Sequence, residues 1–503
     1  MLMQTNDLTL PDAITSFIDG AFVDATGHVI DVVDPATGNV VSHLYEADAA
    51  EVDAAVRAAR TAFDKTDWPQ WQVAERQRAL LALHDCIMDN LDELAALETL
   101  NTGIPLTQTK GMHVPRAAQN FKFFAETINQ LGGEVFDQEP DVTSFVTHEP
   151  LGVCVLIGPW NMPLGLTAMK IAGALAYGNT CVVKPSEITP LTVARFIELA
   201  RDVLPAGVLN LVNGRGHITG TSLSSHADID MVSFTGGTQT GAAILTSLAS
   251  GIKRPAMELG GKSANIIFDD ADFDYALDGA IFGSFMNNGQ MCLAGSRIFV
   301  QRGIAERFIA AFTERTKSLR LGDPSDPTTE IGPMIDGAQC ARMLRYAKSG
   351  EEQSATLLTG GKMAAGYGSD LFVEPTVMLA PDNDLAICQE EIFGPFATIQ
   401  IFDDEDDVAA RANASDFGLV GYVWTEGLTR AMRVAKALRT GTVLVNTPIV
   451  RDLRTGFGGF KMSGLGREGA NGSRAMFTEE KATIIAQGKR SFPRMGLGPV
   501  DGK

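Results

Sequence analysis

The feature that most restricts the fold of this chain is an alternation of short apolar runs with helical segments, which starts near residue 151. Four such runs occupy residues 151–157, 180–183, 208–212 and 231–234, with helical patterns between the first three. Short, continuously apolar runs are typical of parallel strands that are buried on both faces of a sheet. The alternation therefore predicts an α/β fold with helices on both sides of a parallel sheet.

The alternation resumes after residue 260, which indicates a second α/β unit. Residues 265–268 and 297–300 have the pattern of strands. Before the first unit, residues 47–100 have helical spacing and are predicted to form two helices, broken near Trp68-Pro69. Towards the end, residues 476–486 have the pattern of an edge strand. At 503 residues, the chain has room for about three domains.

The charge of the chain argues against some classes of function. Asp and Glu together number 61 and Lys and Arg 41, which gives a net charge of −20. A protein this acidic is a poor candidate for coating nucleic acid or an anionic membrane surface. No apolar run reaches the roughly 18 residues of a membrane span, and the N-terminus lacks the basic start of a secretory signal. We therefore expect a cytoplasmic protein that binds neither nucleic acid nor membrane.

The six cysteines are scattered and form neither a Cys-x-x-Cys pair nor a Cys/His cluster, so we expect no bound metal and no disulfide framework. Cys292 lies in a glycine-rich segment, GQMCLAGSR, between a predicted helix and a predicted strand. A lone cysteine is most often a buried, unreactive thiol. In a glycine-rich turn, however, a substrate can approach the sulfur closely, which makes Cys292 a candidate nucleophile.

Polar residues follow several predicted strands, at the edge where ligands bind in open α/β sheets. Glu258, in MELGGKS, could be a general base. Asn161, in GPWNMP, could donate an amide hydrogen to an oxyanion, although an asparagine that only caps a turn would look the same. Lys184 and Glu187, in KPSE, suit the hydroxyls of a ribose. A carboxylate there would repel a 2′-phosphate, which favours NAD over NADP.

Seven segments occur together in the order typical of one enzyme family. They are PWNMP, KPSE, FTGGTQTG, MELGGKS, GQMCLAGSR, EEIFGPF and GFGGFKMSGLGRE. From about Ile18 to about Ala486, the sequence resembles the NAD(P)-dependent aldehyde dehydrogenase superfamily. Within that family, residues 450–455 (VRDLRT), 114–125 (VPRAAQNFKFFA) and 466–470 (GREGA) resemble the 2-hydroxymuconate and 2-aminomuconate semialdehyde dehydrogenases.

The resemblance implies the aldehyde dehydrogenase fold, which has three parts. The first is a Rossmann-like parallel-sheet domain that binds the dinucleotide, expected at residues 1–130 and 151–258. The second is an α/β catalytic domain at residues 259–475. The third is a small β oligomerisation arm with a C-terminal tail, at residues 131–150 and 476–503. The arm implies a homodimer or a homotetramer.

The resemblance also implies catalytic roles. Cys292 resembles the nucleophile that attacks the aldehyde to give a thiohemiacetal, and the Asn161 amide with the main-chain N–H of Cys292 resembles the oxyanion hole. Hydride transfer to NAD then leaves a thioester. Glu258 resembles the base that activates water to hydrolyse this thioester, and Lys170 matches a lysine that supports a proton relay. The implied activity is NAD-dependent oxidation of an aldehyde to a carboxylic acid.

The cofactor contacts follow from the same resemblance. Lys184 and Glu187 would hold the adenine-side ribose, and Glu391 would hold the nicotinamide-side ribose with Phe393 packed nearby. Gly237 stands where the family usually has a serine, in the turn that faces the phosphates. The residues expected at the cofactor are Ile157, Pro159, Trp160, Lys184, Ser186, Glu187, Gly220, Phe234, Gly236, Gly237, Thr238, Gly241, Leu259, Gly260, Glu391 and Phe393.

For the substrate, Arg116 and Arg451 match arginines at the mouth of the semialdehyde subgroup, and Arg454 and Phe460 are expected near them. A guanidinium fork suits a carboxylate, so the expected substrate is a carboxylate-bearing semialdehyde such as a muconic semialdehyde. If these arginines only make salt bridges, a neutral aromatic or aliphatic aldehyde fits instead. A third possibility is transfer of the thioester to coenzyme A. Glu258 argues against it, because an attacking thiol needs no base for water.

Overall fold

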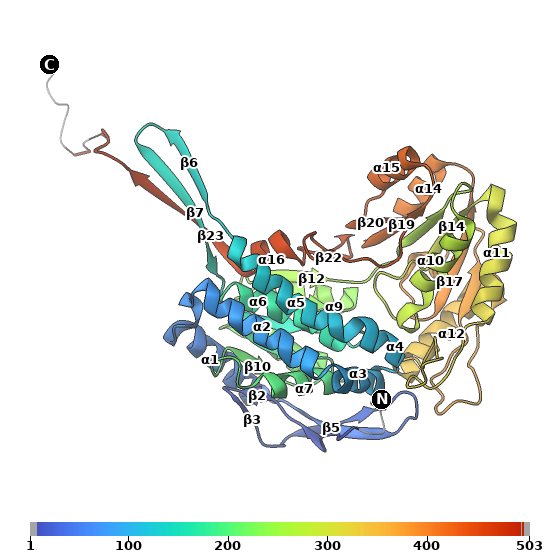
Figure 1. The fold of residues 1–503 in the computed structure, drawn as a ribbon, viewed down its shortest axis with the longest axis horizontal. Helices are drawn as coiled ribbons and strands as arrows, with labels where there is room; N and C mark the ends of the chain where they lie inside the picture. The colour runs from blue at the N-terminus through green and yellow to red at the C-terminus, as the bar shows by residue number, and fades with distance from the viewer. Residues whose placement is uncertain (1–7, 494, 497–503) are drawn as a thin grey trace.

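Two parallel sheets form the body of the protein in the computed structural model, which describes residues 8–493, 495 and 496 (Figure 1). The first sheet has five parallel strands in the spatial order β10-β9-β8-β11-β12. Short antiparallel strands extend both edges, β22 beside β12 and the β2-β3 pair beside β10. The parallel sheet predicted from the apolar runs is confirmed. The bounds are β8 (Val153–Ile157), β9 (Thr180–Lys184), β10 (Leu209–Leu211), β11 (Met231–Thr235), β12 (Arg254–Glu258), β22 (Gly464–Leu465), β2 (Phe17–Ile18) and β3 (Ala21–Phe22).

Alternate residues of the central strands enter two different cores, which explains why these strands are apolar without interruption. In β8, Leu156 packs in the core that contains residues of α6 (Pro163–Ala176), whereas Val155 packs with α1 (Ala49–Lys65) on the opposite face. All five residues of β8 and all five of β9 are buried. A strand covered on both faces leaves no position for a solvated side chain.

The helical region before the first sheet contains three helices rather than the two predicted. The break near Trp68-Pro69 is confirmed as a 3-10 turn, Trp68–Gln70. A second break separates α2 (Val73–Asp89) from α3 (Leu91–Thr102). Asn90 leaves the helical conformation there, with φ −116°, and its side-chain amide donates to the carbonyl of Cys86 at 2.8 Å. Asparagine readily satisfies a helix end in this way, and the hydrophobic pattern carries no trace of it.

The second sheet is also mainly parallel, in the order β15-β16-β17-β14-β13-β19-β20, with only β15 antiparallel to its neighbour. Helices α10 and α11 share one core with it, and α14 and α15 share another on the opposite face. This confirms the second α/β unit. The bounds are β13 (Ala264–Ile267), β14 (Arg297–Gln301), β15 (Thr356–Thr359), β16 (Thr376–Leu379), β17 (Phe396–Phe402), β19 (Val420–Trp424), β20 (Thr442–Val445), α10 (Phe273–Phe285), α11 (Arg302–Lys317), α14 (Glu405–Asn413) and α15 (Leu428–Ala437).

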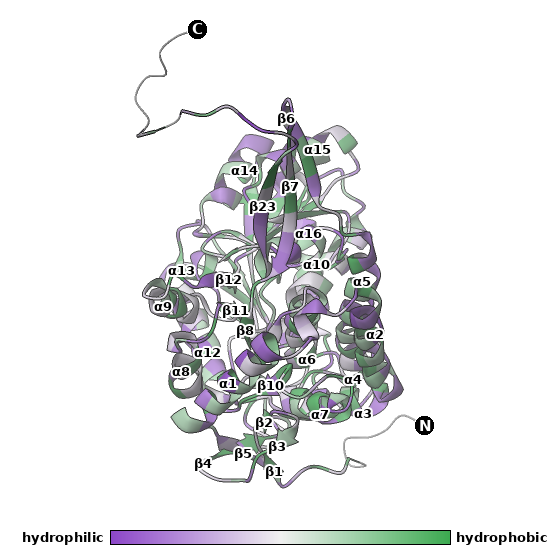
Figure 2. Cartoon of the chain, turned by 90° about the vertical axis from the view of Figure 1, so that its left-hand side faces the viewer, coloured by the Kyte–Doolittle hydropathy of each residue, from purple (hydrophilic) through white to green (hydrophobic). Residues whose placement is uncertain are grey.

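A three-stranded antiparallel arm projects from the body next to the first sheet (Figure 1). It consists of β6 (Glu134–Glu139), β7 (Val142–Pro150) and β23 (Thr478–Ala486), and β23 pairs with β7 along its whole length. The edge strand predicted at residues 476–486 is confirmed. In Figure 2 the arm strands lie in front of the upper part of the body and carry both hydrophobic and hydrophilic residues.

The remaining elements complete the layers around the two sheets. A small sheet, β1-β5-β4, lies near the N-terminus, and β18 pairs with β21. Within the described residues, no helix has the length and apolar character needed to cross a lipid bilayer. The bounds are β1 (Ala13–Ile14), β4 (His28–Val33), β5 (Val40–Glu46), β18 (Phe417–Gly418), β21 (Phe460–Lys461), α4 (Leu106–Gln108), η3 (Thr109–His113), α5 (Val114–Thr127), η4 (Ile128–Gln130), α7 (Leu191–Ala200), η5 (Gly216–Gly220), α8 (Thr221–Ser225), α9 (Thr238–Ala249), η6 (Met286–Gly289), α12 (Gly337–Glu352), α13 (Ala386–Gln389) and α16 (Ala470–Phe477).

Candidate active site

The carboxyl ends of the first sheet and the amino ends of the second sheet line one cleft of about 330 Å³. The first sheet supplies the turns after β8, β9, β11 and β12, and the second supplies the segments before β14 and β17. Strand order in the first sheet reverses between β8 and β11, which is where open α/β sheets bind ligands. The predicted residues that line the cleft are Ile157, Pro159, Trp160, Asn161, Lys184, Ser186, Glu187, Phe234, Gly236, Gly237, Glu258, Leu259, Gly260, Cys292, Glu391 and Phe393.

Cys292 lies half-buried in this cleft, after the short 3-10 turn that ends at Gly289. Burial is the main reason that the pKa of its thiol rises to about 12, and the carboxylates of Glu391 and Glu258 add to the rise. A thiol with this pKa is protonated at neutral pH, so it becomes a nucleophile only when a base or a nearby positive charge assists it.

Glu258 ends β12 and is buried, with 6% of its surface exposed. Burial raises the pKa of this carboxyl well above its usual range, and the neighbouring Glu468 raises it further. Its Oε2 atom is buried and has no hydrogen-bond partner among the residues that the structure describes. A buried carboxyl with a raised pKa and an oxygen free of hydrogen bonds can take a proton from a water molecule in the cleft.

Lys170 lies on α6 behind Glu258, where its ammonium donates to Glu468 Oε1 at 2.7 Å and to Ser233 Oγ at 3.0 Å. Sequence reasoning did not single out Glu468. The only available signal was its place in the GREGA segment, a carboxylate in a glycine-flanked turn. The structure gives Lys170 a buried acidic partner, which is the arrangement that a proton relay needs.

Asn161 is 6% exposed, and its side-chain amide donates to the carbonyl of Gln290 at 2.8 Å. Gln290 precedes Cys292 by two residues, so this bond ties the turn after β8 to the loop that carries the thiol. The second N–H of the Asn161 amide remains available for a ligand in the cleft. Asn161, Cys292 and Glu258 therefore line the same cleft.

At one end of the cleft, the segment with Glu391 and Phe393 lies close against the two glycines that follow Leu259. The main-chain N–H of Gly261 donates to Glu391 Oε1 at 2.9 Å, and a Cβ at Gly260 would come within 2.3 Å of Glu391 Oε2. Burial is the main reason that the pKa of Glu391 rises to about 7. The Phe393 ring stands edge-on to Trp160, with centroids 5.1 Å apart. This end of the cleft is rigid and partly aromatic.

At the other end, Lys184 is the last residue of β9 and Glu187 follows it, and their charged groups lie 3.5 Å apart. Burial lowers the pKa of the Lys184 ammonium, although the charge of Glu187 partly compensates. Glu187 also accepts from the main-chain N–H of Gly216 at 3.3 Å. A carboxylate and an ammonium that share one opening can accept from and donate to vicinal hydroxyls.

Between these ends, Gly237 caps the N-terminus of α9, and its Cβ position faces open space. Thr238 begins this helix, and its hydroxyl is buried with no partner among the described residues. The free N–H groups of a helix N-terminus attract phosphate. A pyrophosphate with a ribose on each side therefore fits the donors of this cleft. Gly241 and Gly220 do not line the cleft themselves, but their Cβ positions face Leu259 and Lys184, which do.

A second groove, of about 760 Å³, contains the predicted substrate arginines. Arg116, Arg451 and Arg454 line it together with Arg474, which sequence reasoning missed. Arg454 is largely exposed and paired with Asp452 at 2.6 Å. Phe460 lies outside both the groove and the cleft, on β21. In the part of the chain that is described, no group of three or more His, Cys, Asp or Glu side chains could hold a metal ion.

Comparisons with known proteins show which family the chain matches. A model described as "Aldehyde dehydrogenase family" matches residues 22–483. The chain is 42% identical to the 5-carboxymethyl-2-hydroxymuconate semialdehyde dehydrogenase of Escherichia coli, over 91% of this chain and 97% of that protein. It is 41% identical to the 2-hydroxymuconic semialdehyde dehydrogenase of Pseudomonas sp. strain CF600, over 94% and 99%. A structure of a Bacillus cereus aldehyde dehydrogenase with NAD+ matches with a TM-score of 0.92 and 38% identity, over 94% and 96% of the chains.

Proposed function

Because the chain belongs to the aldehyde dehydrogenase family and is therefore an NAD-dependent enzyme that oxidises aldehydes, we propose that its substrate is a semialdehyde that carries a carboxylate. The observation that carries this proposal is the pair of arginines in the second groove. The Arg116 guanidinium lies 3.5 Å from the carbonyl of Arg451. Burial, and then the charge of Arg451, lowers the pKa of Arg116 to about 10.

Two half-buried cations in one groove repel each other unless an anion joins them. Arg451 is held in place by the main-chain carbonyls of Glu468 and Thr455, at 2.9 and 3.3 Å, and by the Phe457 ring beneath its guanidinium. It also lies close enough to Glu258 for their charges to interact. A carboxylate bound by this pair would bring the aldehyde of the same molecule towards the cleft that holds Cys292.

In the chemistry that we propose, the Cys292 thiol loses its proton to solvent water, and the sulfur of the thiolate bonds to the aldehyde carbon. The Asn161 amide and the main-chain N–H of Cys292 stabilise the oxygen anion of the resulting thiohemiacetal. NAD supplies the hydride acceptor, and loss of hydride from the carbon leaves a thioester on Cys292. Glu258 then removes a proton from water, whose oxygen attacks the thioester carbon, and the carbon–sulfur bond breaks to release the carboxylic acid and the Cys292 thiolate.

The buried Lys170–Glu468 pair supports passage of the proton from Glu258 to solvent, since Glu468 raises the pKa of Glu258 and is itself hydrogen-bonded to Lys170. Transfer to coenzyme A is disfavoured, because an attacking thiol would make the buried base unnecessary. Names of the relatives agree with the substrate class, since both are semialdehyde dehydrogenases.

The substrate proposal is tested by replacing Arg116 and Arg451 separately with Gln and measuring NADH formation. Loss of one charge-assisted hydrogen bond removes roughly 1.5–3 kcal/mol of binding, so we expect the KM for 2-hydroxymuconate semialdehyde to rise about tenfold or more. The KM for hexanal or benzaldehyde should change less than about twofold.

Arg454→Gln is the matched control. Arg454 lines the same groove but is already neutralised by Asp452, so its replacement should change neither KM appreciably. Equal effects of the Arg116 and Arg451 variants on acidic and neutral aldehydes would contradict the proposal. That result would favour a neutral aldehyde as the substrate.

We also propose that the arm makes the protein a homo-oligomer, either a dimer or a tetramer. Val135, Phe136 and Ile484 on its strands are exposed in the single chain. Exposed apolar side chains on a projecting sheet are typical of a subunit interface. Sedimentation velocity of the wild type should give a dimer or larger, and Phe136→Lys should shift it towards the monomer. A monomeric wild type would contradict this proposal.

A further inference from the structure

The loop that leads to Cys292 begins with three consecutive residues in the left-handed conformation. Asn287 has φ 58° and ψ 33°, Asn288 has φ 54° and ψ 28°, and Gly289 has φ 66°. Residues other than glycine rarely adopt this conformation, and asparagine tolerates it better than most. Both asparagines are buried, with at most 1% of their surface exposed. The backbone alone thus accounts for asparagine at both positions but not for their side-chain contacts.

The Asn287 side chain joins two loops that come from different sheets. Its Nδ2 atom donates to the main-chain carbonyl of Asn161 at 3.0 Å and to that of Gln290 at 2.9 Å. In return, Asn161 Nδ2 donates to the same Gln290 carbonyl at 2.8 Å. Both asparagine side chains thus donate to the Gln290 carbonyl, and Asn287 also donates to the Asn161 carbonyl. The hydrogen bonds join Asn287, Asn161 and Gln290 in a closed ring.

This ring restricts the groups that would form the oxyanion hole. One N–H of the Asn161 amide is committed to Gln290, which leaves the other to point at a ligand. Gln290 is two residues before Cys292, so the ring ties the position of the Asn161 amide to that of the Cys292 main chain. The main chain at Asn287 is also held in place, since its N–H donates to Gln108 Oε1 at 2.9 Å.

We propose that Asn287 is a positioning residue that sets the geometry of the oxyanion hole by holding Asn161 and the Cys292 loop together. This inference rests on the proposed role of Asn161 in stabilising the oxyanion. Donors of an oxyanion hole act only when they are preorganised around the developing charge. Loss of the Asn287 amide would let the Asn161 loop and the Cys292 loop move apart without removing either donor.

Asn288 provides a matched control within the same turn. It is equally buried and equally left-handed, and its side chain makes three hydrogen bonds where that of Asn287 makes two. These bonds go to Gly103, Gly332 and Pro333, and none goes to Asn161. Glycine at either position preserves the backbone conformation and removes only the side-chain bonds. The two substitutions therefore differ mainly in which loop loses its partner.

The experiment compares Asn287→Gly and Asn288→Gly by kcat, by KM for NAD and aldehyde, and by melting temperature. We expect Asn287→Gly to lower kcat about 10- to 100-fold with the KM for NAD within about twofold, because loss of oxyanion stabilisation acts on the transition state. Asn288→Gly should lower the melting temperature at least as much, with kcat within about threefold. Equal losses of kcat in the two variants would overturn the proposal.

A double-mutant cycle with Asn161→Ala separates this inference from the role of Asn161 itself. If Asn287 acts through Asn161, the double variant should be no slower than Asn161→Ala alone. Additive losses would show that Asn287 acts in some other way and would overturn the inference. A small effect of Asn161→Ala by itself would instead contradict the proposed oxyanion role, so the two failures are distinguishable.

Discussion

The two sheets of this protein are both mainly parallel, but they present opposite ends of their strands to the cleft that they share. The first sheet presents the carboxyl ends of its strands to the cleft, as open α/β sheets usually do. The second sheet presents its amino ends to the same cleft, and its own carboxyl ends lie at its opposite edge. The comparison indicates that the direction of the strands does not by itself decide which edge of a parallel sheet is open to a ligand. The residues in the turns at that edge decide it as well.

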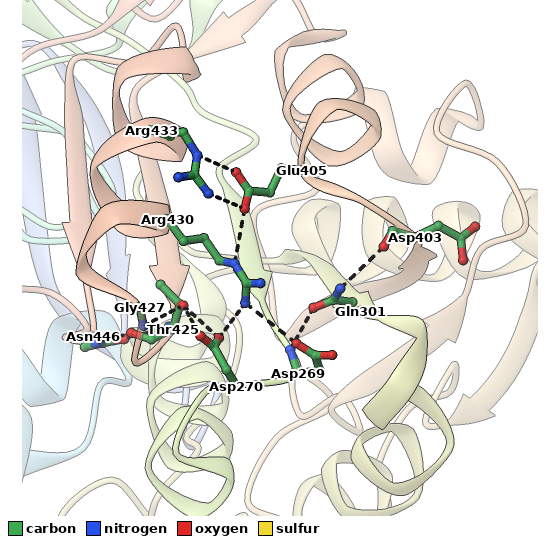
Figure 3. A network of polar contacts seen from close by, with 10 residues as sticks. All are labelled: Asp269, Asp270, Gln301, Asp403, Glu405, Thr425, Gly427, Arg430, Arg433 and Asn446. Atoms are coloured by element: carbon green, nitrogen blue, oxygen red, sulfur yellow. Dashed lines mark hydrogen bonds and ion pairs between the residues drawn. The ribbon is translucent and has the colours of Figure 1, made fainter.

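At its carboxyl edge, the second sheet has a network of ion pairs instead of a glycine-lined opening (Figure 3). Arg430 Nη1 lies 2.8 Å from Asp270, just beyond β13, and its Nε lies 3.2 Å from Glu405, just beyond β17. Its guanidinium also lies over the Phe268 ring, 4.8 Å from the centroid. Thr425, which follows β19, donates to Asp270. These contacts join the ends of three strands. The charges at this edge pair with one another, and their side chains cover the strand ends.

The first sheet has the reverse composition at its carboxyl edge. Gly236, Gly237 and Gly260 line the opening there, the Cβ position of Gly237 faces open space, and Lys184 and Glu187 also line the cleft. The difference predicts that substitutions at the cleft will change activity, whereas substitutions at the closed edge of the second sheet will change stability.

The largest effect is expected from Cys292→Ala, which removes the nucleophile at the shared cleft. Dehydrogenase activity should fall by about four orders of magnitude or more, since no other group can form the thioester. NADH absorbance and the melting temperature should be measured together. Cys86→Ala, at a half-buried thiol outside the cleft, is the control and should keep its activity. Substantial activity in Cys292→Ala would place the nucleophile elsewhere.

A smaller effect is expected from Glu187→Gln at the carboxyl edge of the first sheet. The KM for NAD should rise about tenfold, because one charge-assisted hydrogen bond to a ribose is weakened. Preference for NAD over NADP should fall as well, since a neutral amide repels a 2′-phosphate less. Glu198→Gln, an exposed acid on α7 outside the cleft, should change neither value. An unchanged KM in Glu187→Gln would remove this residue from the cofactor site.

The smallest effect on activity is expected from Arg430→Leu at the closed edge of the second sheet. Loss of the cation leaves Asp270 partly buried without its ion-pair partner and leaves Glu405 with Arg433 alone, which should cost about 1–2 kcal/mol and lower the melting temperature by about 2–6 °C. The value of kcat should stay within about twofold. A strong loss of kcat without a lower melting temperature would break the distinction between the two edges.

The sequence predicted most of the cleft because its residues follow strands whose pattern is local. Apolar runs and glycines alone could place Glu258, Asn161 and Lys184 at the ends of strands and Cys292 between a helix and a strand, and their roles came from the resemblance to a family. Glu468, whose partner is distant in sequence, was missed, although Lys170 was itself predicted from the resemblance. Lys170 and Glu468 are 298 residues apart, and no local pattern pairs them.

Asn287 was missed for a different physical reason. The helical pattern of α10 extends through it, whereas the chain turns left-handed there because Asn161, 126 residues earlier, supplies a carbonyl for its amide. Similarly, Asn90 breaks a helix by bonding back to the main chain, which leaves hydrophobic spacing unchanged. Polar side chains that bond the main chain are thus the features that pattern reasoning is least able to find.

The central claim is that Cys292 and Glu258, contributed by the two sheets, act in succession at one cleft. A single-turnover measurement with Glu258→Gln tests it most directly. Acylation and hydride transfer should proceed, giving a burst of about one NADH per active site, and hydrolysis should then slow the steady state roughly 100- to 1000-fold. Cys292→Ala should give no burst. Absence of the burst in Glu258→Gln, or steady turnover at the wild-type rate, would contradict the account.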